Sequence, residues 1–129
     1  MRIYISHATD KNYDFREFLY EPLQASPLAK EHIFIFPHER DYGSEPHNMK
    51  DEIIRSSFVL AEVSYPSTGS GIELGWASEH GKQIFCLYQY GRDYSRSLLV
   101  LTKHIDHYSG ATELVQKITD FIKDNPQLR

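Results

Sequence analysis

The sequence predicts an α/β protein: a doubly wound, five-stranded parallel sheet of the flavodoxin or Rossmann type, in three α/β/α layers. Five short apolar runs, rich in β-branched and aromatic residues, alternate along the chain with segments of helical period. Strands that alternate with helices form parallel sheets with right-handed crossovers. The length of 129 residues suits a sizeable buried core, so residues 1–129 are expected to form a single domain.

The expected elements follow from these periods. Strands are predicted at residues 2–6, 32–36, 58–63, 83–88 and 104–108. Helices are predicted at residues 13–23, 49–57 and 111–123, with a short helical turn over Leu98 and Leu99 that Ser95 or Ser97 caps. Asp10 is expected to cap the first helix, and residues 124–129 are expected to be unordered.

The stretch from residue 58 to residue 89 organises the chain. Its first strand ends in a loop of small residues, 66–71, which a helical segment and the next strand follow. Glu73 stands where this loop becomes the helix. Free N–H groups and the helix dipole attract an anion at such a point, so a phosphate could dock there. A first-turn glutamate with Ser67 or Ser70 as N-cap is equally the pattern of ordinary helix capping.

Charge and composition limit the partners. The formal net charge of -4 argues against nucleic-acid binding, whereas a small anionic ligand held by backbone and hydroxyl groups needs no positive charge. Every apolar run is shorter than the roughly 20 residues of a membrane span, and the chain opens with a strand pattern, so a cytoplasmic protein without membrane contact is expected. The single cysteine, Cys86, is predicted to be a buried thiol.

The histidines do not form a metal motif. Four of them, His38, His47, His104 and His107, have irregular spacings, with no His-Glu-x-x-His and no cysteine partner. Neither a metal nor a cofactor is therefore expected.

Four loops are expected at the carboxyl ends of the strands, where doubly wound sheets bind their ligands. They cover residues 7–10, 37–48, 64–70 and 90–97. The second is long, polar and without a period, and such loops in compact domains are more often functional than incidental. We therefore expect the ligand-binding site to lie in these loops.

The run AEVSYPSTGSGIELG, with GKQIFCLY after it, resembles the nucleoside 2-deoxyribosyltransferase family, and most closely its 2′-deoxynucleoside 5′-monophosphate N-hydrolases. The matching residues are Ala61, Glu62, Val63, Pro66, Ser67, Gly69, Gly71, Glu73, Leu74 and Gly75. Two features extend the resemblance over most of the chain. Tyr4 stands where the family has a tyrosine that lines the sugar pocket, and Ser97, followed by three apolar residues, matches a phosphate-binding element.

The resemblance implies cleavage of the N-glycosidic bond of a nucleoside 5′-monophosphate, by hydrolysis or by transfer to another base. Glu73 would be the nucleophile that attacks the anomeric carbon, as a carboxylate does in retaining glycoside hydrolysis. Ser67 and Ser97 would hold the 5′-phosphate, assisted by helix N-termini and with Gly69 and Gly71 beside them. The expected partner is thus a small-molecule nucleotide.

In the family, the proton donor to the leaving base is an aspartate in the helix before the central strand. An ungapped comparison places Met49 at that position, and Asp51 takes the role if this helix is about two residues shorter. Two interpretations stay open: Asp51 donates the proton, or the donor is missing. Family members often pair so that a neighbour completes the pocket, so a homodimer is expected, with Tyr65, Trp76 and Tyr90 as candidate interface residues.

Two other functions stay open. The opening IYISHATD, followed by an amphipathic helix, also resembles the start of a Toll/interleukin receptor (TIR) domain, and some TIR domains cleave NAD. A non-catalytic nucleotide-binding module on the same scaffold is the second. The run PSTGSGIELG favours the deoxyribosyltransferase resemblance, because TIR domains lack that Pro-Ser and Gly-x-Gly approach to the glutamate.

Overall fold

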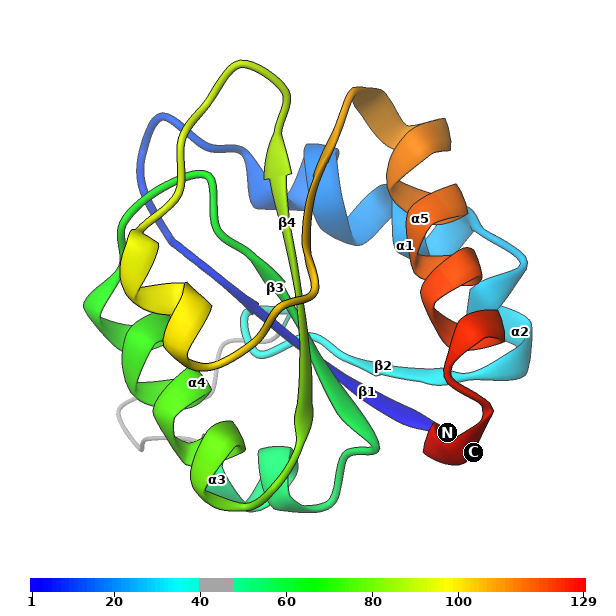
Figure 1. The fold of residues 1–129 in the computed structure, drawn as a ribbon. Coiled ribbons are helices and arrows are strands. Elements are labelled where there is room, and N and C mark those ends of the chain that lie inside the picture. The colour runs from blue at the N-terminus through cyan, green and yellow to red at the C-terminus, as the bar shows by residue number, and fades with distance from the viewer. Residues whose placement is uncertain (40–47) are drawn as a thin grey trace.

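The computed structural model describes residues 1–39 and 48–129, which contain one five-stranded parallel sheet (Figure 1). Its strands, in chain order, are β1 (Arg2–His7), β2 (Ile33–Ile35), β3 (Phe58–Glu62), β4 (Gln83–Gln89) and β5 (Ile105–Tyr108). Their spatial order is β2-β1-β3-β4-β5, and every pair is parallel. This is the predicted sheet, and its order reverses direction between β1 and β3, the switch point of a flavodoxin-like fold.

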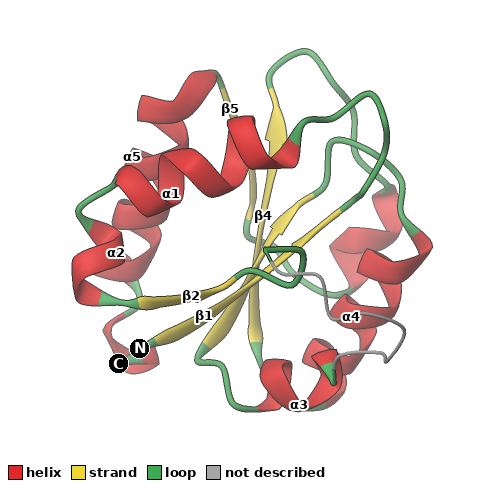
Figure 2. Cartoon of the chain, turned by 180° about the vertical axis from the view of Figure 1, so that it is seen from behind, coloured by secondary structure: helices red, strands yellow, loops and turns green. Residues whose placement is uncertain are grey.

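The described helices cover both faces of the sheet (Figures 1 and 2). They are η1 (Arg16–Tyr20), α1 (Glu21–Ala25), α2 (Leu28–Glu31), α3 (Met49–Ile54), α4 (Thr68–Glu79), η2 (Arg96–Val100), α5 (Gly110–Asp124) and η3 (Pro126–Leu128). Figure 2 shows α1, α2 and α5 on one face and α3 and α4 on the other, which confirms the three layers. Within the described ranges, no helix combines the length and the apolar character that crossing a bilayer requires.

Some predicted element boundaries were wrong. The first helix begins later than predicted, with the π-helical turn η1, and Asp14 caps it instead of Asp10, since Asp14 Oδ1 accepts from the Glu17 N–H at 3.1 Å. The tail is ordered, because η3 follows α5 and the Asn125 amide donates to Phe121 O at 2.8 Å. Most of the predicted polar loop, residues 40–47, lies outside the described residues.

Alternation along β1 divides the core into two clusters. Ile3 and Ile5 face the cluster under α1 and α5, whereas Tyr4 faces the cluster under α3 and α4. All three side chains are fully buried. Cys86 is buried in the second cluster, as predicted, and burial raises the pKa of its thiol to about 12. The sheet therefore presents hydroxyl-bearing side chains of β1 toward α4.

Candidate active site

A cavity of about 740 Å³ opens between two of the predicted loops at the carboxyl ends of the strands. It lies between the β3–α4 loop and the β4–η2 loop, beside the switch point rather than at it. Of the predicted phosphate-binding residues, Ser67, Gly71 and Ser97 line this cavity, and Gly69 does not. Ser64, Tyr65, Ser70 and Arg92 also line it.

Glu73 lies next to this cavity, on the side of α4 that faces β1. It stands in the second turn of the helix, and not in the first turn as predicted, because α4 begins at Thr68. Both carboxylate oxygens accept hydrogen bonds from β1: Tyr4 donates to Oε2, and Ser6 donates to Oε1 at 2.9 Å. Capping of the first turn therefore does not explain Glu73, which is a half-buried carboxylate oriented by two strand hydroxyls.

The surroundings of Glu73 act on its pKa in two directions. Burial raises the pKa of the Glu73 carboxyl, and the hydrogen bonds from Tyr4 and Ser6 oppose the rise because they stabilise the charged form. Burial and the charge of Glu73 both raise the pKa of Tyr4, so its hydroxyl keeps the proton that it donates. The carboxylate is thus poorly hydrated and fixed in direction, which suits a nucleophile.

A line of hydrogen bonds connects Glu73 to the cavity. Ser6 Oγ lies 2.7 Å from Ser70 Oγ, and the Ser70 N–H donates to Ser67 Oγ at 3.1 Å. Ser6 and Ser70 are both buried, and Ser70 lines the cavity. Sequence reasoning missed Ser6, because a serine at the end of an apolar strand carries no signal of its contact with a residue of a distant helix.

Ser67 caps α4, which was one of the two predicted capping alternatives. Its side chain accepts from the Ser70 N–H, and its carbonyl accepts from the Gly71 N–H at 3.0 Å. The N–H groups of Thr68 and Gly69 precede the first intrahelical donor and so have no acceptor within the helix. Together with the helix dipole, these two donors favour an anion beside Ser67.

The small-residue segment is helical, which corrects the predicted loop. Gly69 and Gly71 belong to α4, and neither has a positive φ, so the backbone does not require glycine there. A Cβ built at either position would meet no atom within 4 Å. These glycines leave open surface around the start of α4, where a side chain would otherwise stand.

Arg92 supplies a cation that sequence reasoning missed. Its guanidinium lies 3.9 Å from the centre of the Tyr65 ring, and its Nε–H donates to Ser64 O at 2.9 Å. These contacts hold the plane of the guanidinium in place while its other N–H groups make no contact that the structure records among the described residues. A fixed arginine in the wall of a cavity is suited to bind a phosphate or a carboxylate.

Ser97 lies in η2 and lines the cavity opposite α4. Ser95 is the N-cap residue of η2, without a side-chain hydrogen bond to the helix, and it lines the cavity as well. The predicted helical turn over Leu98 and Leu99 is confirmed as this 3₁₀ helix. The structure therefore brings Ser67 and Ser97 to one cavity, although 30 positions separate them in the sequence.

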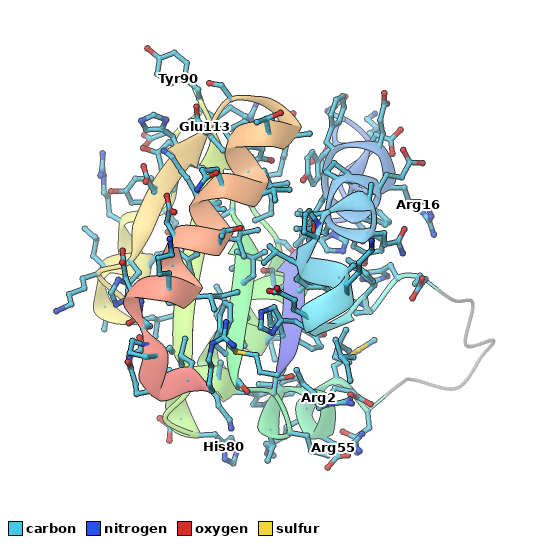
Figure 3. The ribbon with its side chains drawn as sticks, turned by 90° about the vertical axis from the view of Figure 1, so that its right-hand side faces the viewer. Arg2, Arg16, Arg55, His80, Tyr90 and Glu113 are labelled. Atoms are coloured by element: carbon cyan, nitrogen blue, oxygen red, sulfur yellow. The ribbon has the colours of Figure 1, made fainter. Side chains whose placement is uncertain are left out.

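The structure records no contact between Asp51 and Glu73 among the described residues. Asp51 lies in the first turn of α3, and its carboxylate pairs with Arg55 Nε at 3.3 Å, with both side chains 55% exposed. Figure 3 shows Arg55 beside Arg2, at the end of the molecule opposite Tyr90, which follows the carboxyl end of β4. Met49 packs instead against the buried cluster that contains Tyr4 and Leu74.

Glu62 is a buried carboxyl group on the other face of the sheet. Ser64 donates to it twice, from the backbone N–H at 2.7 Å and from Oγ at 2.9 Å, and Tyr108 donates a third hydrogen bond. Burial raises the pKa of Glu62 despite these three donors. Ser64 Oγ also accepts from the Gln89 N–H at 2.8 Å, so this carboxyl group ties together the loops that line the cavity.

His7 forms a second buried polar group, beside Glu62 on the neighbouring strand. Its Nδ1–H donates to Ala8 O at 2.8 Å, so Nε2 accepts from the Tyr20 hydroxyl at 2.6 Å. The Tyr20 hydroxyl accepts in turn from the His38 N–H at 3.1 Å. Burial lowers the pKa of His7 to about 4. Over residues 1–39 and 48–129, no three His, Cys, Asp or Glu side chains gather as a metal site would require.

No protein-family model matches the chain. A protein of Nematostella vectensis, provisionally named 2′-deoxynucleoside 5′-phosphate N-hydrolase 1, is 44% identical over 52 residues. The matched segment is 40% of this chain and only 30% of that relative.

Solved structures match over nearly the whole chain. The CMP N-glycosidase BcmB of Clostridium botulinum has a TM-score of 0.67 at 22% identity, over 94% of this chain and 99% of its own. A 2-deoxyribosyltransferase of Bacillus psychrosaccharolyticus has a TM-score of 0.62 at 15% identity, over 88% of this chain and 90% of its own. The chain thus has the fold of these structures. Over 52 residues its sequence is similar to that of the N-hydrolase, the kind of protein that its motifs resemble.

Proposed function

We propose that this protein is an enzyme of nucleotide metabolism that cleaves the N-glycosidic bond of a nucleoside 5′-monophosphate, with Glu73 as nucleophile. The observation that carries the proposal is the arrangement of Glu73. Its two oxygens accept hydrogen bonds from Tyr4 and Ser6. The cavity beside it is lined by Arg92 and by the two serines predicted to bind phosphate, Ser67 and Ser97. The Glu73 carboxylate suits an electrophilic carbon of the substrate, and the neighbouring cavity wall, with its arginine and hydroxyl groups, suits a phosphate.

The proposed reaction has two steps. A Glu73 oxygen attacks C1′ of the sugar, the bond between C1′ and the base nitrogen breaks with its electron pair going to the base, and a proton from Asp51 neutralises the base. Water, or a second base in a transferase, then attacks C1′ and displaces the glutamate as a carboxylate, and the proton that the attacking group loses returns to Asp51. For Asp51 to take this part, its pair with Arg55 must open, because the carboxylate is held there now.

The phosphate end of the substrate is proposed to bind at the start of α4. Ser67, the free N–H groups of the first turn and Arg92 offer donors of the kind that phosphate oxygens accept. Ser97 adds a hydroxyl from the opposite wall. Gly69 and Gly71 contribute open surface beside these donors. The wall also carries the Asp93 carboxylate, which pairs with Arg96 at 3.7 Å, so Arg92 is the cation that remains to meet a phosphate.

The similar proteins support this choice of chemistry. They are named as a CMP N-glycosidase, a 2-deoxyribosyltransferase and a 2′-deoxynucleoside 5′-phosphate N-hydrolase, and each of these names refers to the bond between sugar and base. CMP is a ribonucleotide and the other two names refer to 2-deoxyribose, so the names leave the sugar open. They also leave hydrolysis and transfer open.

A base-release assay tests the proposal. The protein is incubated with the ribo- and deoxyribonucleoside 5′-monophosphates, and free base is followed by chromatography, with and without a second base as acceptor. Base release from at least one monophosphate is expected. Nucleotide binding without release from any of them would favour the non-catalytic module, and release from NAD alone would favour the TIR-like alternative.

We also propose a homodimer. Aromatic and aliphatic side chains stand exposed on several elements: Ile54, Ile72, Tyr90, Leu99 and Val100. Of the three aromatic residues predicted for an interface, Tyr90 is exposed, and Tyr65 and Trp76 are half-buried. Sedimentation equilibrium over a range of concentrations measures the oligomeric state, and a monomer at every concentration would contradict this proposal.

A further inference from the structure

The direction of the hydrogen bonds between Glu73 and the cavity can be deduced from donor counting. A carboxylate can only accept, so the single Ser6 hydroxyl proton is committed to Glu73 Oε1, 2.9 Å away. Ser6 Oγ nevertheless lies 2.7 Å from Ser70 Oγ. The proton of that second hydrogen bond must therefore come from Ser70. This order holds for the ionised Glu73 that a nucleophile requires.

Ser70 consequently offers the cavity only lone pairs. Its hydroxyl proton is used on Ser6, and its backbone N–H is used on Ser67 Oγ. Ser70 is 8% exposed and lines the cavity, so its hydroxyl oxygen is a fixed acceptor at the wall. A phosphate oxygen is also an acceptor and would be repelled, whereas a ligand hydroxyl would donate to it.

The position of Ser70 points to one particular hydroxyl. Ser70 precedes Glu73 by three residues on the same side of α4, a spacing that puts their Cβ atoms roughly 5–6 Å apart. In the proposed reaction Glu73 attacks C1′, and C2′ is bonded to C1′. Attack opposite the base brings Glu73 to the sugar face that, in a ribonucleotide, also carries the 2′-hydroxyl. This hydroxyl is then on the side of α4, where Ser70 stands.

We infer that Ser70 accepts a hydrogen bond from the 2′-hydroxyl of the substrate, and that the site takes ribonucleoside 5′-monophosphates in preference to their 2′-deoxy forms. The inference rests on the proposed function, since it uses the position of C1′ at Glu73. A 2′-deoxy sugar leaves the Ser70 acceptor without a donor in a partly dehydrated site, which weakens its binding.

The experiment compares matched substrate pairs that differ only at C2′, such as CMP with dCMP and AMP with dAMP. The ratio of kcat/KM for the ribo and deoxy forms is measured for the natural protein and for Ser70→Ala. Ser78→Ala, an exposed serine of the same helix, is the control. Ser70→Ala is expected to lower the ratio about tenfold, or about 1.4 kcal/mol, whereas Ser78→Ala leaves it unchanged. The N-glycosidic bonds of ribo- and deoxyribonucleotides differ in intrinsic lability, and this difference cancels when the kcat/KM ratios of two proteins are compared.

A binding measurement needs neither turnover nor a variant. Calorimetry with the natural protein compares ribose 5-phosphate, 2-deoxyribose 5-phosphate and 2-deoxy-2-fluororibose 5-phosphate. Fluorine cannot donate a hydrogen bond, so the fluoro sugar is expected to bind as weakly as the deoxy sugar. A fluoro sugar that binds as tightly as ribose 5-phosphate would overturn the inference, as would a kcat/KM ratio that Ser70→Ala leaves unchanged.

The two proposals fail in different ways. Absence of base release from every nucleotide would overturn the proposed function. The sugar phosphates still test the inference in that case, because tighter binding of ribose 5-phosphate that Ser70→Ala removes would support the acceptor at Ser70. Equal binding of the three sugars would overturn it, whatever the catalytic result.

Discussion

The hydroxyl of Tyr4 donates a hydrogen bond to Oε2 of Glu73, across 69 positions of sequence. One residue comes from the buried strand β1 and the other from the second turn of α4. The bond stabilises the charged carboxylate, whereas burial favours the neutral acid, and the burial effect is the larger. The pKa of Glu73 is therefore raised, and the hydrogen bond from Tyr4 makes this rise smaller.

Tyr4→Phe is expected to raise the pKa of Glu73 further, because the variant keeps the burial and loses a donor to the charged form. The acid limb of the kcat/KM profile, where the glutamate must be ionised, should move to higher pH. Profiles measured for the natural protein and the variant check this. Tyr90→Phe, at a residue that is 72% exposed, serves as control. If the acid limb of Tyr4→Phe stays at the natural pH, the Tyr4 hydroxyl does not stabilise the ionised Glu73.

Glu73→Gln is expected to reduce base release by about 10³-fold or more, since an amide cannot form the glycosyl intermediate. Glu79→Gln, an exposed glutamate of the same helix, should keep the natural rate. Circular dichroism and thermal unfolding confirm that both variants are folded. A folded Glu73→Gln protein with the natural rate would remove Glu73 from the mechanism.

Arg92→Gln is expected to raise the KM for a nucleoside 5′-monophosphate roughly tenfold to a hundredfold, the range for a charge-assisted hydrogen bond of about 1.5–3 kcal/mol. The KM for the unphosphorylated nucleoside should not change, because no phosphate meets the guanidinium. Steady-state kinetics with both substrates measure this difference. Lys103→Gln, at an exposed lysine outside the cavity, is the charge-matched control. Equal losses with nucleoside and nucleotide would argue for a purely structural Arg92.

Asp51→Asn is expected to lower kcat by about 10²-fold, the lower end of the range for a general acid. The loss should fall on the step that releases the base, so it should be seen in single-turnover experiments. Glu52 lies beside Asp51 in α3 and hydrogen-bonds both Arg2 and Arg55, so Asp51→Asn leaves Arg55 with a carboxylate partner. If Asp51→Asn keeps the natural rate, another group or water supplies the proton to the leaving base.

His7 should make stability depend on pH. Burial lowers its pKa in the folded protein from 6.5 to about 4, so the folded state binds fewer protons than the unfolded state between those values. The contribution of His7 is complete above pH 6.5 and is lost as the pH falls toward 4. Urea unfolding at several pH values should show this slope, and His7→Asn should reduce it. His80→Asn, at an exposed histidine, should not.

The sequence was sufficient to predict the sheet and most of the elements around it, because buried parallel strands and amphipathic helices repeat with distinct periods. It misplaced the start of α4. The small residues after Ser67 have the composition of a loop, yet one hydrogen bond from the Ser70 N–H to Ser67 Oγ is enough to begin the helix there. The sequence offered both Ser67 and Ser70 as caps, and only the geometry shows that Ser67 is the one that begins the helix.

The candidate site was predicted only in part. Ser67 and Ser97 were expected to meet and do, since both follow strands that end at the same edge of the sheet. Ser6 and Arg92 were missed, because their importance comes from contacts with Glu73 and Tyr65 that join different elements. Contacts between residues of different elements leave no periodic pattern in the sequence from which they could be predicted. The roles of all these residues in catalysis and binding stay predictions.

The alternation along β1 has a consequence for how this site can fail. Tyr4 points to α4 while Ile3 and Ile5 point to the other cluster, and Ser6 meets Glu73 on the same side as Tyr4. Sliding β1 by one residue against β3 would exchange these sets, burying hydroxyls among aliphatic groups and leaving Glu73 without donors. A chain that pairs β1 one residue out of register would therefore lose the packing of the core and the hydrogen bonds to Glu73 together.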